Sequence, residues 1–146
     1  VKLKDTGVYI VGGKEPKEYI DLVKMMGADK VHFIDFKKKS ELEEYYLASD
    51  IFVHPTREDI WGLVINEAMS KGLPIVTTDK CIAGLTMITP GKNGVIVPID
   101  SPELLAKGIE ECLRFRHVYS KNALEEVKYF TLRNMVDIHL KEWREE

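Results

Sequence analysis

Two carboxylates flank a glycine-containing segment in the middle of this chain. Asp59 and Glu67 lie eight positions apart, with Gly62, Leu63 and Val64 between them. Residues 62–71 are predicted to form a helix, so the amides of its first turn would lack partners within the helix. Amides at a helix start, together with the helix dipole, bind anionic groups such as phosphate. The pattern therefore predicts a site for a phosphate-containing ligand next to two acids.

The residue types around this helix start suggest what else the ligand carries. Gly62 would let a phosphate approach the backbone closely. Glu67 lies about one turn into an otherwise apolar helix, where a carboxylate needs hydrogen-bond donors such as ribose hydroxyls. Asp59, in the loop before the helix, could reach a sugar hydroxyl, and its neighbour Glu58 is the alternative candidate for that role. Each of these acids could instead complement the helix dipole or pair with a neighbour.

Short apolar runs that alternate with helical segments position these residues. We expect strands where short, mainly apolar runs of three to five residues occur, at residues 8–11, 31–34, 50–54, 74–78 and 95–97. We expect helices after Pro16, from Ser40 with a capping box formed with Glu43, over 62–71, from Pro102, and around 118–130 and 131–146.

Strands this short and apolar, separated by helices, are typical of a parallel sheet covered on both faces. We therefore predict an α/β fold: a Rossmann-like, doubly wound parallel sheet of about five to six strands, followed by C-terminal helices. Ligands of such sheets bind beyond the carboxyl ends of the strands. The turns at that edge are Gly12–Gly13 and residues 35–39, 54–61 and 79–84.

Composition excludes several classes of partner. The formal net charge is −3, which gives no indication of a nucleic-acid partner. No apolar run reaches the ~18–20 residues that span a membrane. Cys81 and Cys112 lie far apart, which indicates reduced thiols rather than a disulfide framework or a metal site. His54 ends a strand at the expected ligand-binding edge, and we read Cys81 as an ordinary loop residue near it. We expect no metal and no cofactor.

Two other nucleotide- or phosphate-handling folds are rejected. A phosphoacceptor receiver domain needs an acid pair after the first strand and an aspartate ending the third, where this chain has Gly12–Gly13 and His54. A dinucleotide oxidoreductase needs Gly-x-Gly-x-x-Gly after the first strand, which is absent. A nucleotide-sugar epimerase and a non-catalytic nucleotide-binding module on the same fold stay open as alternatives.

The ordered blocks resemble the carboxyl-terminal domain of retaining glycosyltransferases of the GT-B architecture, the large group 1 family. The resemblance rests on the acid pair around Trp61-Gly62-Leu63, on Glu67-Ala68-Met69 and on Gly72-Leu73-Pro74. Upstream, Val8–Gly13 falls where the family has a strand and turn, and downstream 90–98 matches a recurrent loop and strand. Asp59 departs from the pattern because the family usually has Glu there, and Glu58 could be the first acid instead.

The resemblance implies a role for each matched residue toward a nucleotide-sugar donor. Glu67 would hold the ribose, the Leu63 and Val64 amides the diphosphate, and Asp59 or Glu58 the donor sugar. Backbone at Asp35, Phe36 and Lys37 would frame the base, and Gly12 and Gly13 would line the phosphate cleft. Gly62 would let the diphosphate approach the backbone, and Trp61 would either stack within the donor site or act as a packing anchor. The chain has no Asp-x-Asp sequence, so we expect transfer that does not depend on a metal ion. The resemblance implies that a hexose is transferred with retention of configuration and without a protein nucleophile.

The resemblance also implies a partner domain. We expect residues 1–146 to be one nucleotide-sugar-binding domain, one half of a GT-B fold, whose N-terminal acceptor domain is missing. The last helix, about 131–146, would cross back to that domain. We further expect an enzyme of glycan or cell-envelope polysaccharide biosynthesis that is cytoplasmic. It could associate peripherally with the inner face of the membrane through the acceptor domain. The base, sugar and acceptor are not predicted.

Overall fold

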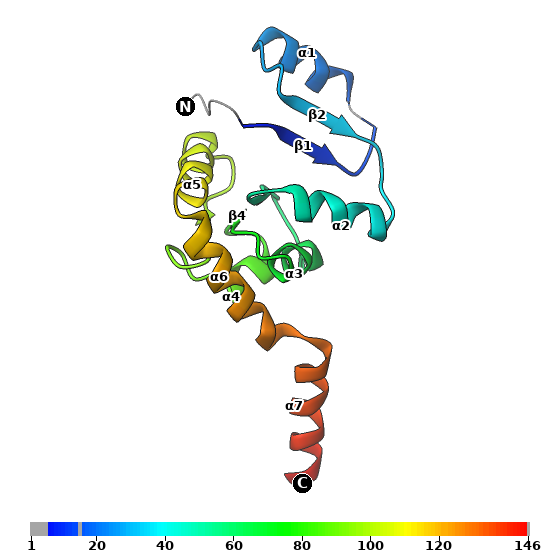
Figure 1. Ribbon diagram of the computed structural model, residues 1–146, viewed down its shortest axis with the longest axis vertical. Helices are drawn as coiled ribbons and strands as arrows, with labels where there is room; N and C mark the ends of the chain where they lie inside the picture. Colours follow the sequence, from blue (N-terminus) through cyan, green and yellow to red (C-terminus); the bar gives the residue numbers. More distant parts are fainter. Residues whose placement is uncertain (1–5, 15, 146) are drawn as a thin grey trace. The chain divides into compact units, whose positions relative to one another are not determined.

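Strands and helices alternate along most of the chain, as a computed structural model shows for residues 6–14 and 16–145 (Figure 1). The chain divides into two compact units, Val1–Leu47 and Ala48–Glu146, which are described separately. In chain order the elements are β1 (Val8–Val11), α1 (Lys17–Met25), β2 (Val31–Ile34), α2 (Lys39–Ala48), β3 (Phe52–His54), α3 (Leu63–Ser70), β4 (Ile75–Thr78), α4 (Ile82–Met87), β5 (Gly94–Val97), α5 (Pro102–Arg114), α6 (Arg116–Glu126), the 3-10 helix η1 (Val127–Phe130) and α7 (Leu132–Glu145).

The first unit is built on a parallel strand pair. β1 and β2 pair in register, from Val8 opposite Val31 to Val11 opposite Ile34. The amphipathic helix α1 lies along this pair (Figure 1), and its Tyr19 and Leu22 line a hollow of about 450 Å³ together with apolar residues of both strands. The hollow extends to Gly12 and Gly13, at the carboxyl end of β1.

The second unit is built on a three-stranded parallel sheet in the order β3-β4-β5. The central strand β4 is buried along its whole length, because it has a neighbour on each side and helices against it. Val76 of β4 forms a core cluster with Cys112 of α5 and Tyr119 of α6. At the start of β5, a Cβ on Gly94 would lie 2.4 Å from the carbonyl oxygen of Ile75, so only glycine fits there.

The expected fold class is confirmed: an α/β chain whose five strands pair in parallel and whose last elements are helices. In the described residues the strands form two sheets, one in each unit. The expected capping box at Ser40 and Glu43 is wrong. Helix α2 begins at Lys39, so Ser40 lies inside it. The amide of Lys38, the residue before the helix, donates to the Glu41 carboxylate at 3.0 Å, so Glu41 performs the capping.

The C-terminal helix α7 has an apolar stripe that remains exposed. Leu132 is 78% exposed and Trp143 71%, with Met135, Val136 and Ile138 each about half exposed. The helix follows η1 and is anchored there by the Asn134 side chain, which donates to the Tyr129 carbonyl at 2.6 Å. Across residues 6–14 and 16–145, no helix combines the length and the hydropathy that crossing a bilayer requires.

Candidate functional site

Two loops at the carboxyl edge of the three-stranded sheet are joined by backbone hydrogen bonds. One loop leads from β3 to α3 and the other from β4 to α4. The amide of Asp59 donates to the Lys80 carbonyl at 3.0 Å, and the amide of Ile82 donates to the Asp59 carbonyl at 3.3 Å. The amide of Ala83 then donates to the Trp61 carbonyl at 2.7 Å. These bonds fix the loop that carries the predicted acid against its neighbour.

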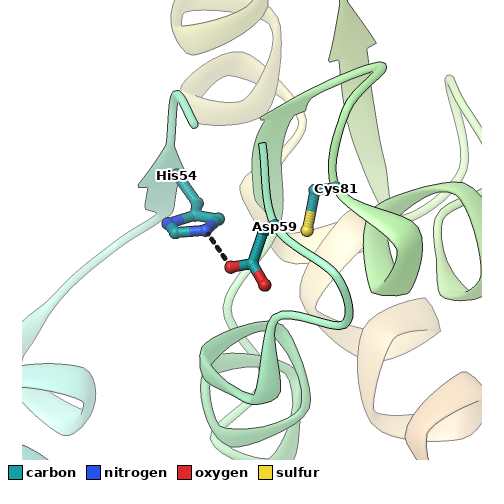
Figure 2. Close-up of side chains that lie close together, drawn as sticks. All are labelled: His54, Asp59 and Cys81. Carbon is teal, nitrogen blue, oxygen red and sulfur yellow. Dashed lines mark hydrogen bonds and ion pairs between the residues drawn. The ribbon is translucent and has the colours of Figure 1, made fainter. Parts of the chain in front are cut away.

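The carboxylate of Asp59 has a partner on each oxygen. Figure 2 shows the His54 ring, at the end of β3, pointing at this carboxylate, with Nε2 donating to Oδ2 at 2.9 Å. The other oxygen, Oδ1, accepts the Trp61 amide at 3.2 Å. Both side chains are about one quarter exposed. Asp59 is therefore held in one orientation while its oxygens keep lone pairs for a further donor.

His54 is itself anchored to the sheet. Its backbone carbonyl accepts the hydroxyl of Thr77, on the neighbouring strand β4, at 2.8 Å. Its ring stacks on Phe52, with the ring centroids 6.2 Å apart. The imidazole therefore projects from a strand that is paired over its whole length.

Helix α3 begins beside this pair at a left-handed glycine. Gly62 has φ 89° and ψ 60°, and no side chain caps the helix. A Cβ at this position would lie 2.8 Å from the Cys81 sulfur and 3.3 Å from Asp59 Oδ2. Within the described residues the first helical amides, at Leu63 and Val64, have no backbone or side-chain acceptor. The helix start therefore presents unpaired donors at the sheet edge where ligands of parallel α/β folds bind.

The two other predicted acids differ in burial. Glu67 is half-buried in α3, one turn beyond the helix start, whereas Glu58 is exposed in the loop. The backbone next to Glu58 forms a local turn, with the Thr56 hydroxyl donating to the Glu58 carbonyl at 2.8 Å. Asn66, next to Glu67, has a buried Oδ1 that accepts no hydrogen bond from any residue the structure describes.

The remaining predicted donor-binding residues lie in the first unit. Gly12 and Gly13 line the hollow at the end of β1. Asp35, Phe36 and Lys37 follow β2 directly, with Phe36 77% exposed and Lys37 Nζ 3.9 Å from a Glu41 oxygen. The geometry thus joins Asp59, Trp61 and Gly62 in one cluster with His54. Gly12, Gly13 and the residues predicted to frame the base belong to the first unit.

Cys81 joins the cluster in a way that its sequence context did not indicate. The residue is fully buried, and its sulfur lies 3.7 Å from the Trp61 carbonyl. Figure 2 shows the thiol beside the His54–Asp59 pair, and the ligand-type atoms of the three side chains lie within 4.8 Å of one another. Cysteine, histidine and aspartate are also ligands of Zn²⁺. The expectation of a metal-free site stays a prediction.

The sequence and fold of the chain match one protein family and several of its members. Residues 2–126 match the family described as "Glycosyl transferases group 1". D-inositol 3-phosphate glycosyltransferase of Corynebacterium diphtheriae is 31% identical over 117 residues, which are 75% of this chain and 27% of that protein. The Escherichia coli K12 lipopolysaccharide glucosyltransferase WaaG is 32% identical over 78 residues, which are 53% of this chain and 20% of that protein.

Solved structures of such proteins share the fold. The crystal structure of WaaG superposes with a TM-score of 0.70 and 27% identity over 85% of this chain and 34% of that one. The C-terminal domain of the group 1 protein LpcC from Francisella tularensis superposes with a TM-score of 0.75 and 24% identity, covering 87% of this chain and 70% of that domain. The chain spans 27% and 20% of the length of the two curated relatives.

Proposed function

Because this chain belongs to the group 1 glycosyl transferases, we propose that it binds the donor in an enzyme that transfers a hexose from a nucleoside diphosphate sugar. Transfer would proceed with retention of configuration and without a metal ion. The acceptor would be a glycan or a lipid. The epimerase-like activity considered from the sequence has no counterpart in the relatives described above, which are glycosyltransferases.

The observation that carries the proposal is the uncapped start of α3 beside Asp59. Breaking the glycosidic bond to a nucleoside diphosphate builds negative charge on the leaving group. Preorganised donors that face this charge stabilise the transition state. The amides of Leu63 and Val64 are such donors, since they follow Gly62 at the helix start and no side chain caps the helix.

The acids complete the proposed donor contacts. Glu67, one turn into α3 and half-buried, would accept hydrogen bonds from the ribose hydroxyls. Asp59 is favoured over Glu58 as the acid that contacts the donor sugar, because it is half-buried at the helix start whereas Glu58 is exposed. Gly12, Gly13 and the backbone of Asp35, Phe36 and Lys37 would serve the phosphate and the base.

The acceptor would bind to a second domain. The exposed apolar stripe of α7 supports this assignment, because contiguous apolar surface on a helix is typical of a segment that packs against another domain. We propose that this domain is N-terminal, that it carries any contact with the membrane surface, and that the enzyme acts in the cytoplasm on cell-envelope glycans. WaaG, a glycosyltransferase involved in lipopolysaccharide biosynthesis, supports the pathway class.

Calorimetry tests the donor site directly. UDP, GDP, ADP and their glucose, mannose and N-acetylglucosamine derivatives would be titrated into the chain and into the variant Glu67→Ala. Loss of a charge-assisted hydrogen bond costs about 1.5–3 kcal/mol, so we expect binding about 10- to 100-fold weaker. Glu103→Ala, an exposed acid in the first turn of α5, is the control and should bind as the wild type does.

Two outcomes would contradict the proposal. If none of these compounds binds to the wild-type chain, the chain is not a donor-binding domain. If Glu67→Ala binds as tightly as Glu103→Ala, Glu67 lies outside the site. A companion pair, Asp59→Ala and Glu58→Ala, identifies the first acid. The Asp59 change should weaken nucleotide-sugar binding more than nucleoside diphosphate binding, and the Glu58 change should affect neither.

A further inference from the structure

The two partners in the His54–Asp59 hydrogen bond have different mechanical support. His54 projects from β3, where its carbonyl accepts the Thr77 hydroxyl at 2.8 Å and its ring stacks on Phe52. Asp59 lies in the loop that follows, outside any strand or helix. Groups on paired strands hold their positions more closely than groups on loops. The bond therefore transmits the rigidity of the sheet to the loop carboxylate.

The Asp59 carboxylate needs this support at its distal end. The Trp61 amide, at 3.2 Å from Oδ1, constrains only one of its two oxygens. The backbone bonds to Lys80 and Ile82 fix the main chain but leave rotation about the side-chain bonds. The 2.9 Å bond from His54 Nε2 to Oδ2 is the contact that sets the carboxylate plane.

We propose that His54 is a positioning residue: it orients the Asp59 carboxylate so that its remaining lone pairs meet hydroxyls of the donor sugar. This inference rests on the donor-binding function proposed above. His54 does not touch the donor in this scheme. Its effect is confined to the sugar, because the diphosphate is held by amides of α3 that do not depend on the imidazole.

Two other readings of the same cluster make different predictions. The imidazole could contact the sugar itself through Nδ1, with Asp59 as the group that orients it. Alternatively, His54, Asp59 and Cys81 could be ligands of a metal ion, since their ligand-type atoms lie within 4.8 Å of one another. The hydrogen bond between His54 Nε2 and Asp59 Oδ2 pairs these two atoms without an ion.

Amide variants at position 54 separate these readings, because each amide replaces one ring nitrogen. The His54→Gln amide reaches about as far as Nε2 and can donate to Asp59, whereas the shorter His54→Asn amide replaces Nδ1. The experiment measures, by calorimetry, the affinities for the nucleotide sugar that binds best among UDP-glucose, GDP-mannose, ADP-glucose and UDP-N-acetylglucosamine, and for its nucleoside diphosphate. His54→Ala and Cys81→Ser are measured alongside, and the wild type with and without EDTA.

The proposal predicts a specific order of affinities. His54→Gln should bind the nucleotide sugar within about twofold of wild type, and His54→Asn and His54→Ala about tenfold or more weaker. All three should bind the nucleoside diphosphate as the wild type does. In an Asp59→Ala background, His54→Ala should cause no further loss, because its effect acts through Asp59. Cys81→Ser and EDTA should leave both affinities unchanged.

Each contrary result overturns the inference in a distinct way. If His54→Asn binds the nucleotide sugar as the wild type does and His54→Gln binds it more weakly, the imidazole contacts the sugar. If Cys81→Ser, His54→Ala and the wild type in EDTA all lose affinity for the nucleotide sugar to the same extent, the cluster is a metal site. Parallel loss of sugar and diphosphate binding would show a general structural role.

If the wild type binds and every His54 variant binds equally, only this inference fails. If the wild type binds none of the probes, the donor-binding function fails and the inference with it. Should His54→Ala not fold, the Gln and Asn variants still decide.

Discussion

Position 62 accepts only glycine, because of its backbone conformation and because of the atoms that surround it. Its φ of 89° lies in the left-handed region, and a Cβ there would lie 2.8 Å from the Cys81 sulfur. The sequence suggested that this glycine admits a phosphate. The structure shows in addition that only glycine allows the chain to turn into α3 between Asp59 and the buried thiol.

Gly62→Ala should therefore lower the stability of the chain. The left-handed conformation alone costs an L-residue about 1–2 kcal/mol, and crowding against Cys81 adds to this. Urea unfolding at constant pH measures the loss in free energy of unfolding. Gly13→Ala is the matched control, because nothing lies within 4 Å of a Cβ there and its φ is outside the left-handed region. Equal stability of the two variants would contradict the strain argument.

The residue-level site was predicted in part. Asp59, Gly62 and the α3 amides could be placed from spacing, since they lie within a few positions of one helix start. The bond from His54 to Asp59 could not, because it depends on how the loop folds back over the end of β3. Cys81 belongs to another loop altogether, and only the pairing of β3 with β4 brings it beside Asp59.

Among the elements, strands were easier to predict than the short helix α4. Apolar runs located each strand to within about two residues. Helix α4 has six residues, contains Gly84 and has no side-chain cap. Its first amides, at Ile82 and Ala83, donate instead to the carbonyls of Asp59 and Trp61 in the loop from β3 to α3. A helix start satisfied by a distant segment leaves no local signal in the sequence.

The packing of α5 and α6 on β4 predicts a loss of stability at alkaline pH. Burial, and then the nearby Glu111, raise the pKa of Cys112 from 9.0 to about 12, and burial also raises the pKa of Tyr119. The unfolded thiol ionises first, so the folded state binds more protons and its stability falls as pH rises from 9 towards 12.

Thermal unfolding across this pH range measures the effect. The unfolding temperature should decline above about pH 9, and more steeply in the wild type than in Cys112→Ala, which lacks the thiol. Tyr119→Phe should reduce the decline further above pH 10 for the same reason. A decline of the same slope in Cys112→Ala and the wild type would show that the thiol does not contribute.

For the whole molecule, the sequence predicted the fold class but not the way the strands divide. Strand-forming runs do not specify which strands exchange hydrogen bonds. The grouping of β1 with β2 and of β3, β4 and β5 in a second sheet is therefore known only from the structure. The boundary between the units falls at the last residue of α2, inside a continuous helix that no linker composition marks.

The chain alone should bind nucleotide weakly and transfer no sugar. The donor contacts proposed here lie within it, but an acceptor needs a surface of its own, which we assign to another domain. Incubation with radiolabelled nucleotide sugar and mixed glycan and lipid acceptors, followed by separation of products, measures transfer. Incorporation of label by the chain alone, absent from Glu67→Ala, would contradict the two-domain scheme.

The backbone bonds that join residues 59–61 to residues 80–83 constrain how this protein can diverge. Each segment both donates and accepts in these bonds, so a residue inserted into or deleted from either bonded stretch would move donors of both segments away from their acceptors. Length changes in one loop must therefore be accompanied by matching changes in its neighbour. Lineages that descend from this chain should vary in length at the surface turns elsewhere and conserve both of these loops as one unit.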